Sequence, residues 1–292
     1  MSQTTYGFSD FVPRQVPASV RLRVLFGGFL SQFGWLFLGF GMIFVWVFQV
    51  DSALASFIAF RGRLESTTGT VAECRKTSYT VNNSPVYATH YAFKSPDGRT
   101  HKGVSYSTGA PPAKGAPVTV EYPKGNPGTS RIKGMSTTPF GMWVSFVLVF
   151  PALGFVFAAI GMRKGVRGLR LLTHGKTGKG KLLSKEPTNT KINDQTVYKL
   201  TFEFVAEDGK TYQAKAKTHH TARLEDETEE PLVYDPLNPS YAVMMDALPG
   251  SPRIGEMGTI ESRRPLVGLL VLVIPLTTIL GHGFYVLSRY IG

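Results

Sequence analysis

Three long apolar runs are the strongest pattern along the chain. Residues 24–50, 134–162 and 265–288 contain no Asp, Glu, Lys or Arg. Each run exceeds the roughly 18–20 apolar residues that a transmembrane helix requires. The pattern therefore predicts three membrane-spanning helices and excludes a wholly soluble protein. The first run is also longer than the apolar core of a signal peptide, about 7–15 residues, so it is expected to be an uncleaved anchor.

Between the apolar runs, the chain changes to the alternation of a β-strand. Apolar and polar residues alternate from 198 to 204, which is the period of a strand with one buried face. Asp208-Gly209 then predicts a hairpin. A three-residue loop turns Lys215 and Lys217 toward water, whereas a two-residue loop would bury both lysines. We therefore expect the three-residue loop, with Gly209 in the left-handed conformation.

An internal repeat predicts the domain organisation. Val86 aligns with Val197, an offset of 111 residues, and Gly98 then falls at the position of Gly209. The matching blocks are 69–71 with 180–182, 86–100 with 197–211 and, with one residue inserted, 122–127 with 234–239. Two copies are too few for a solenoid, so the pattern indicates a duplicated small β domain.

Each copy contains an Asn-Pro pair after its last predicted strand, at Asn126-Pro127 and at Asn238-Pro239. Proline cannot continue a sheet ladder and asparagine favours turns, so these pairs are expected to end the two sheets. Each copy then offers roughly four to six strands in about 65 residues, a size typical of a small sandwich or barrel.

A family resemblance rests on features of the first copy. They are Gly69-x-Val71, the aromatic alternating strand, the Asp97-Gly98 hairpin and the strand that ends at Tyr122 before Asn126-Pro127. Together they resemble the bacterial domain-of-unknown-function family 3592, over most of residues 69–134 and, more loosely, 180–246. The resemblance implies a small β domain beside transmembrane helices of the bacterial inner membrane. It carries over no catalytic residues.

These patterns predict an α+β membrane protein, in which three transmembrane helices alternate with two duplicated, small all-β domains of sandwich or barrel type. The expected segments are an N-terminal segment 1–23, a first transmembrane helix and extension 24–60, a first β domain 61–134, a second transmembrane helix 135–165, a second β domain 166–262, and a third transmembrane helix with the C-terminus 263–292.

The net charge of +12 bears on the topology. Lys and Arg concentrate on the cytoplasmic flanks of membrane spans. With three crossings, ten basic residues lie on the flanks that share a side with the N-terminus, against five on the opposite flanks. We therefore expect a multi-pass protein of the cell membrane with a cytoplasmic N-terminus, the first β domain outside and the second in the cytoplasm. A hairpin within 24–60, or a bend at Pro151, would instead place both domains on one side.

Candidate catalytic and metal-ligating side chains are scattered. His90 and His101 flank the first hairpin but point to opposite faces, so they cannot share a zinc ion. Cys74 is the single cysteine and forms no intrachain disulfide. His219 and His220 are neighbours and are expected in an exposed connection.

Acidic and glycine-rich segments also lack a catalytic pattern. Glu203, Glu207 and Asp208 occupy a solvent face and a turn, and the acidic run 225–230 is expected to be a solvated loop. Residues 175–180 lack the spacing of a P-loop and are expected to form a basic linker at the lipid headgroups. No His, Cys, Asp or Glu cluster is therefore expected to converge, and no metal, no cofactor and no enzymatic activity are predicted. The predicted function is a non-enzymatic binding or assembly module.

The spans carry two further patterns. Gly27, Gly34 and Gly41 recur at every seventh residue and predict a helix face that packs closely on a neighbour. The expected partners are the lipid bilayer and a protein partner or a second copy of the chain. A competing interpretation is a subunit of a transporter or membrane enzyme with a site at Gln32 and His282, because polar groups within a membrane are functional candidates. The absence of a recognised motif argues against nucleic-acid binding.

Overall fold

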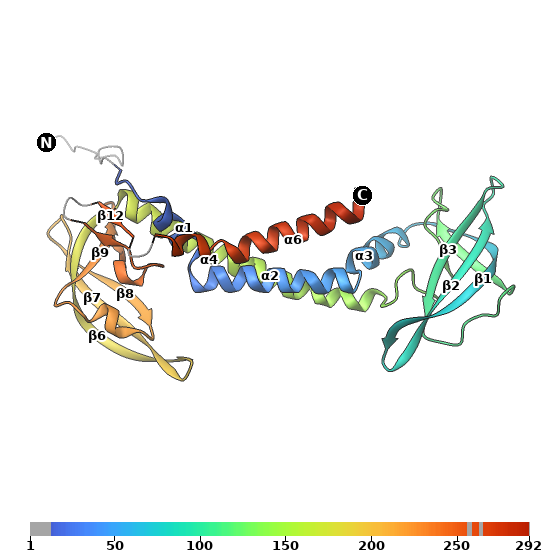
Figure 1. Cartoon of the computed structure of the whole chain (residues 1–292), viewed down its shortest axis with the longest axis horizontal. Coiled ribbons are helices and arrows are strands. Elements are labelled where there is room, and N and C mark those ends of the chain that lie inside the picture. Colours follow the sequence, from blue (N-terminus) through green and yellow to red (C-terminus); the bar gives the residue numbers. More distant parts are fainter. Residues whose placement is uncertain (1–12, 256–258, 263–264, 292) are drawn as a thin grey trace. The chain divides into compact units, whose positions relative to one another are not determined.

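The computed structural model describes residues 13–255, 259–262 and 265–291 (Figure 1). Within these ranges three helical segments are long and apolar enough to cross a membrane, at Phe29–Val47, Met142–His174 and Gly268–Tyr290. Two five-stranded antiparallel sheets alternate with them along the sequence. The α+β class predicted from the sequence is confirmed at this level.

Internal contacts divide the chain into two compact units. The larger unit comprises residues 1–39 and 153–292, and the smaller unit comprises residues 40–152. The smaller unit contains the first sheet, and the larger unit contains the second sheet together with most of the helical residues.

The helices differ from the predicted segments at two places. The helices of the structure are α1 (Ala18–Phe26), α2 (Phe29–Val47), α3 (Val50–Ala59), the 3-10 helix η2 (Met142–Leu148), α4 (Val149–His174), α5 (Val267–Leu270) and α6 (Val273–Tyr290). The segment 24–60 is not one helix, because the chain breaks at Gly27 and again at Gln49, whose φ is 53°. Helix α4 continues past the predicted end at 165, because Leu171 and Leu172 near its C-terminus are buried in the larger unit.

The first β domain is a curled sheet. Its strands are β1 (Leu64–Val81), β2 (Ser84–Lys94), β3 (Thr100–Ser107), β4 (Pro117–Pro123) and β5 (Arg131–Ile132), in the order β3-β2-β1-β4-β5. The long strand β1 pairs with β2 along one part and with β4 along another. The two edges also meet, since the backbone N–H of Ile132 donates to the Ser105 hydroxyl at 2.9 Å.

The second β domain repeats this arrangement. Its strands are β6 (Lys176–Ile192), β7 (Gln195–Val205), β8 (Thr211–Thr218), β9 (Glu230–Asp235) and β10 (Asn238–Met244), in the order β8-β7-β6-β9-β10. The edge strands β8 and β10 contact each other. Two 3-10 turns, η3 (Thr221–Leu224) and η4 (Met245–Ala247), and a small ribbon, β11 (Arg253–Ile254) with β12 (Ile260–Glu261), complete this part of the larger unit.

The cores of the two domains correspond position by position. Under the sequence alignment, the matching buried pairs are Tyr91 and Phe202, Phe93 and Phe204, Val120 and Leu232, and Tyr122 and Tyr234. Both long strands also carry a register shift at the aligned place, after Val71 in β1 and after Leu182 in β6. Because side chains alternate across a strand, these pairs place the same face of each sheet inward.

The hairpin register is the one that the sequence predicted. Phe204 pairs with Tyr212 and Phe202 with Ala214, and the lysines at 215 and 217 are exposed. The backbone N–H of Ala206 donates to the Lys210 carbonyl, which closes a three-residue loop. The glycines at the tips have positive φ, 79° at 98 and 74° at 209.

The Asn-Pro pairs do not end the sheets, and this prediction was wrong. Asn126 and Pro127 lie in the connection to β5, while Asn238 and Pro239 begin β10. A proline is tolerated there because β10 is an edge strand of the hydrogen-bonded ladder, and an edge strand can leave one N–H side unpaired.

The second β domain is joined to the helices by a continuous core within the larger unit. Val20 and Val24 of α1 and Leu172 of α4 pack with Leu248 and Ile260 beyond the second sheet. The predicted basic linker at 175–180 is therefore largely strand, since Lys176 to Gly180 pair with β9. This core, together with the backbone hydrogen bond from Arg14 to Thr173, places the residues just before α2 against the second β domain.

The loop glycine gives a direct test of the fold. Replacing Gly209 by Val should destabilise the second domain by about 1–3 kcal/mol, because a β-branched residue is strained at positive φ. Replacing it by Asn should cost less, because Asn tolerates this conformation better. No atom lies within 4 Å of the added Cβ, so the loss would come from the backbone alone. Thermal melting of the two variants and of the unchanged protein would measure this loss of stability. A Gly209→Val variant as stable as the unchanged protein would contradict the assigned turn.

Candidate functional site

Close helix contacts occur at two of the three predicted packing glycines. A Cβ on Gly34 would meet the backbone of Ala158 in α4, with its Cα at 2.7 Å. A Cβ on Gly41 would lie 2.7 Å from the backbone nitrogen of Pro151. Gly27 instead caps α1 and lies outside α2. The atom nearest to a Cβ added at Gly27 would be the Arg23 carbonyl oxygen of the same helix. The seven-residue stripe is therefore interrupted by the break before α2.

The polar side chains in the spans connect helices. The Gln32 side-chain amide donates to the Phe26 carbonyl at 2.8 Å and to the Val271 carbonyl at 2.7 Å. The His282 Nε2 lies 3.0 Å from the Gly39 carbonyl oxygen. Gln32 and His282 thus tie the third span to the first through backbone groups, and the two side chains do not meet in one site.

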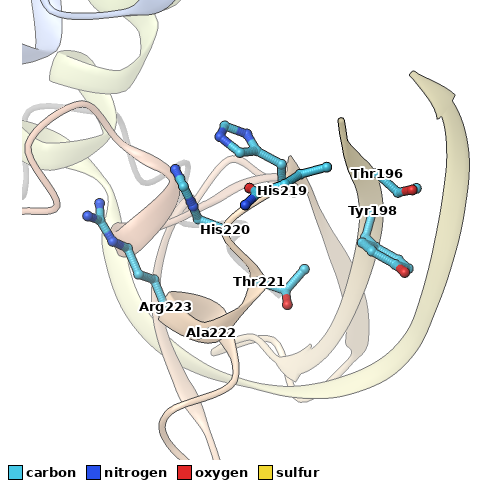
Figure 2. A pocket seen from close by; sticks show the side chains of 8 residues that line it. Thr196, Tyr198, His219, His220, Thr221, Ala222 and Arg223 are labelled. Atoms are coloured by element: carbon cyan, nitrogen blue, oxygen red, sulfur yellow. The ribbon is translucent and has the colours of Figure 1, made fainter. Parts of the chain in front are cut away.

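The second β domain carries an open hollow of about 500 Å³ where β7 begins and β8 ends. Its lining residues are Gln195, Thr196, Tyr198, His219, His220, Thr221, Ala222 and Arg223. Figure 2 shows Thr196 and Tyr198 on the β7 wall, and the labelled residues 219–223 across the opening on the segment that follows β8.

Both walls of the hollow are held by Lys185 of β6. Its Nζ atom lies 5.1 Å from the ring centroid of Tyr198 and donates to the Thr221 hydroxyl at 3.2 Å. It also donates to the Glu225 carboxylate at 2.8 Å. The hydrogen bond from Lys185 lowers the pKa of the Glu225 carboxyl, and a second one from Thr221 lowers it further. Three separate chain segments therefore fix the geometry of the hollow.

The hollow offers hydrogen-bond donors and ring faces. The imidazole rings of His219 and His220 have centroids 3.8 Å apart, and Arg223 adds a guanidinium group. The residues that line the hollow in the described structure include no Asp or Glu. The lining thus combines two imidazole rings, one guanidinium group and the hydroxyl groups of Thr196, Tyr198 and Thr221.

The sequence predicted that His219 and His220 lie in a connection after a strand. It did not predict that they line a hollow together with residues of β7. The one-residue insertion between the aligned blocks, which falls between residues 211 and 234 of the second copy, was the available signal. It indicated only that the two copies differ somewhere between these residues, a range that includes β8 and the segment after it.

The candidate ligands of the first domain stay apart. His101 stacks on Phe93 with ring centroids 5.4 Å apart and contacts the Ser95 hydroxyl at 2.9 Å. His90 pairs with Val104, on the opposite face of the sheet from Phe93. The Cys74 sulfur lies 3.1 Å from the Pro112 carbonyl oxygen.

Three carboxylates of the second domain do converge, which corrects the expectation that none would. Asp226, Glu230 and Asp246 each place one oxygen within 4.8 Å of the others. The acidic run was also predicted to be solvated throughout, yet Glu230 is only 2% exposed. The reason is that β9 begins at Glu230 and pairs it with Gly180 of β6, so its side chain turns inward while 225–229 stay outside.

Comparisons of the chain with protein-family models, with curated proteins and with solved structures find no significant match.

Proposed function

We propose that this chain is a multi-pass membrane protein whose two duplicated β domains are non-enzymatic binding modules, one on each side of the membrane. The observation that carries the proposal is the hollow on β7 and the end of β8. It gives the second domain an open concave surface with a mixed polar and apolar lining, whose chain segments are linked by the contacts of Lys185.

The strand order supports a binding role. In each domain the first strand pairs with the second and the fourth, and the third and fifth strands contact each other. This is the connectivity of a five-stranded, partly open Greek-key barrel, a fold whose second and third strands and adjoining loops bind oligonucleotides and oligosaccharides. The hollow is lined by the first residues of β7, the second strand, and by the connection that follows β8, the third strand. The matching cores and register shifts support the duplication.

The packing of the N-terminal segment supports the three-crossing topology. Val20 precedes the first span, and Leu248 and Ile260 precede the third, yet all three share one core within the larger unit. This shared core supports a topology in which the N-terminal segment and the second β domain lie on the same side of the membrane. The helix ends on that side carry the excess of Lys and Arg, which favours its assignment as the cytoplasmic side.

The chemistry of the lining indicates the class of ligand. Arg223 and the two imidazoles offer donors, and no carboxylate lines the hollow within the described structure. A polypeptide segment that presents carbonyl or carboxylate oxygens matches these groups. The proposed partner is accordingly a protein, bound in the cytoplasm by the second domain.

Site-specific photo-crosslinking tests the proposal. A photoreactive aromatic residue at His220, which is exposed at the rim, should give a discrete protein adduct in cells, reduced several-fold by Arg223→Ala. The control is the same probe at Gln213, an exposed position of β8 outside the hollow. Equal adducts from 220 and 213, or no adduct from 220, would contradict a binding role for the hollow.

A further inference from the structure

The acidic trio, Asp226, Glu230 and Asp246, lies apart from the hollow. Its members come from the loop before β9, from the first residue of β9 and from η4. A second open cavity of about 560 Å³ adjoins it, lined in part by Asp246 and by Glu227. None of the three lines the hollow described above.

The spacing of the trio fits a shared ion. One carboxylate oxygen from each residue lies within 4.8 Å of the other two. Calcium ions bind oxygen at about 2.3–2.6 Å, so two oxygens on one ion are at most about 5 Å apart. The separation lies within this limit for Ca²⁺, whereas Mg²⁺, which binds oxygen at about 2.0–2.1 Å, would need the oxygens within about 4.2 Å of one another.

The environment of the Glu230 carboxylate is a second observation that favours a cation at the trio. Its Oε1 atom accepts a hydrogen bond from the Glu227 backbone N–H at 3.2 Å. Its Oε2 atom is buried and has no hydrogen-bond partner among the described residues. Burial raises the pKa of the Glu230 carboxyl, and the charges of neighbouring carboxylates raise it further. A buried carboxylate oxygen without a partner is costly, and a bound cation would remove that cost.

We propose that Asp226, Glu230 and Asp246 bind one hard divalent cation, Ca²⁺ or Mg²⁺. Carboxylate oxygens are the ligands that both ions prefer, and the remaining positions would be filled by water or backbone carbonyls. Lys179 and Arg253 line the adjoining cavity, and their positive charges limit the affinity of the site.

The position of η4 indicates what the ion does. Met245 and Leu248 flank Asp246 in the chain and pack in the core shared with α1 and α4. A cation on the trio would join the loop before β9 to this segment. It would thereby stabilise the surface on which the helices rest against the second β domain.

Calorimetric titration of the full-length chain in detergent tests the proposal. After treatment with EDTA, the protein is titrated separately with CaCl₂ and with MgCl₂. We expect one site per chain for at least one ion, with affinity lowered at least about tenfold in Asp246→Asn and in Glu230→Gln, because each removes a charged ligand. Glu203→Gln is the matched control, since Glu203 is an exposed carboxylate of the same domain.

Asp226→Asn distinguishes loss of binding from a folding defect. Because Asp226 is exposed on a loop, this substitution should weaken binding of the ion without unfolding the domain. One-site binding that all three trio variants weaken and Glu203→Gln leaves unchanged would support the site. Whichever of Ca²⁺ and Mg²⁺ bound more tightly would be identified as the ion of this site. Absence of binding by both ions, or equal binding by the Glu203 and trio variants, would overturn the proposal.

Discussion

Replacing Gly161 by Val should disrupt the α2–α4 helix pair and destabilise the larger unit by about 3 kcal/mol, the upper end of the usual cost of overpacking. A Cβ at 161 would lie 2.5 Å from the backbone nitrogen of Ser31 and 2.6 Å from its Cα atom. Backbone atoms cannot rotate away as a side chain can, so the helices must separate along their length. Gly34→Val should have a similar effect, because the added side chain would meet the Ala158 backbone.

The measurement is the yield and melting temperature of monodisperse protein extracted in mild detergent. Gly283→Val is the matched control, since Gly283 lies in α6 and no atom lies within 4 Å of its added Cβ. If Gly161→Val and Gly283→Val gave the same yield and stability, the close helix contact would be refuted.

Cysteine labelling of intact cells should give opposite results for the two β domains. In a Cys74→Ser background, a cysteine at Thr80 should react with a membrane-impermeant thiol reagent on intact cells, and a cysteine at Thr190 should not. Both threonines are exposed, on β1 and β6 respectively, so accessibility differs only by the side of the membrane. The serine should be tolerated, because the Cys74 sulfur already lies within hydrogen-bond distance of the Pro112 carbonyl.

Permeabilised cells supply the control, since both positions should then react to the same extent. Labelling of both cysteines on intact cells would contradict the opposite-sides topology and would favour an even number of crossings between the domains. Labelling of position 190 alone would keep three crossings but reverse the orientation, which would contradict the inference from the basic flanks.

Several elements followed from local patterns in the sequence. Each apolar run predicted a span, because about 20 residues without charge are sufficient to indicate one. The loop at Gly209 was predicted because only one register keeps two lysines in water, and a slip of one residue would exchange the faces. The breaks at Gly27 and Gln49 were missed, since both lie inside the charge-free run 24–50 that was assigned to one helix.

The Asn-Pro pairs show where a local signal is insufficient. The turn after Tyr122 was indicated correctly, but the conclusion that the sheet ends there was not. Whether a strand follows depends on a free edge with which it can pair. That edge is provided by β4 or β9 after folding, and nothing near Pro127 or Pro239 in the sequence specifies it.

The sequence by itself determined the three long apolar helical segments, the strand alternation and the hairpin register, and its self-alignment pairs positions that are buried in both sheets. Each depends on periodicity over a few residues or on the alignment of the chain with itself. Only the tertiary structure decided that Lys185 contacts Tyr198 and Glu225, and that Glu230 meets Asp246. The physical reason is that strand pairing and the return of the segment after β8 bring together residues whose separation in the chain carries no signal of contact.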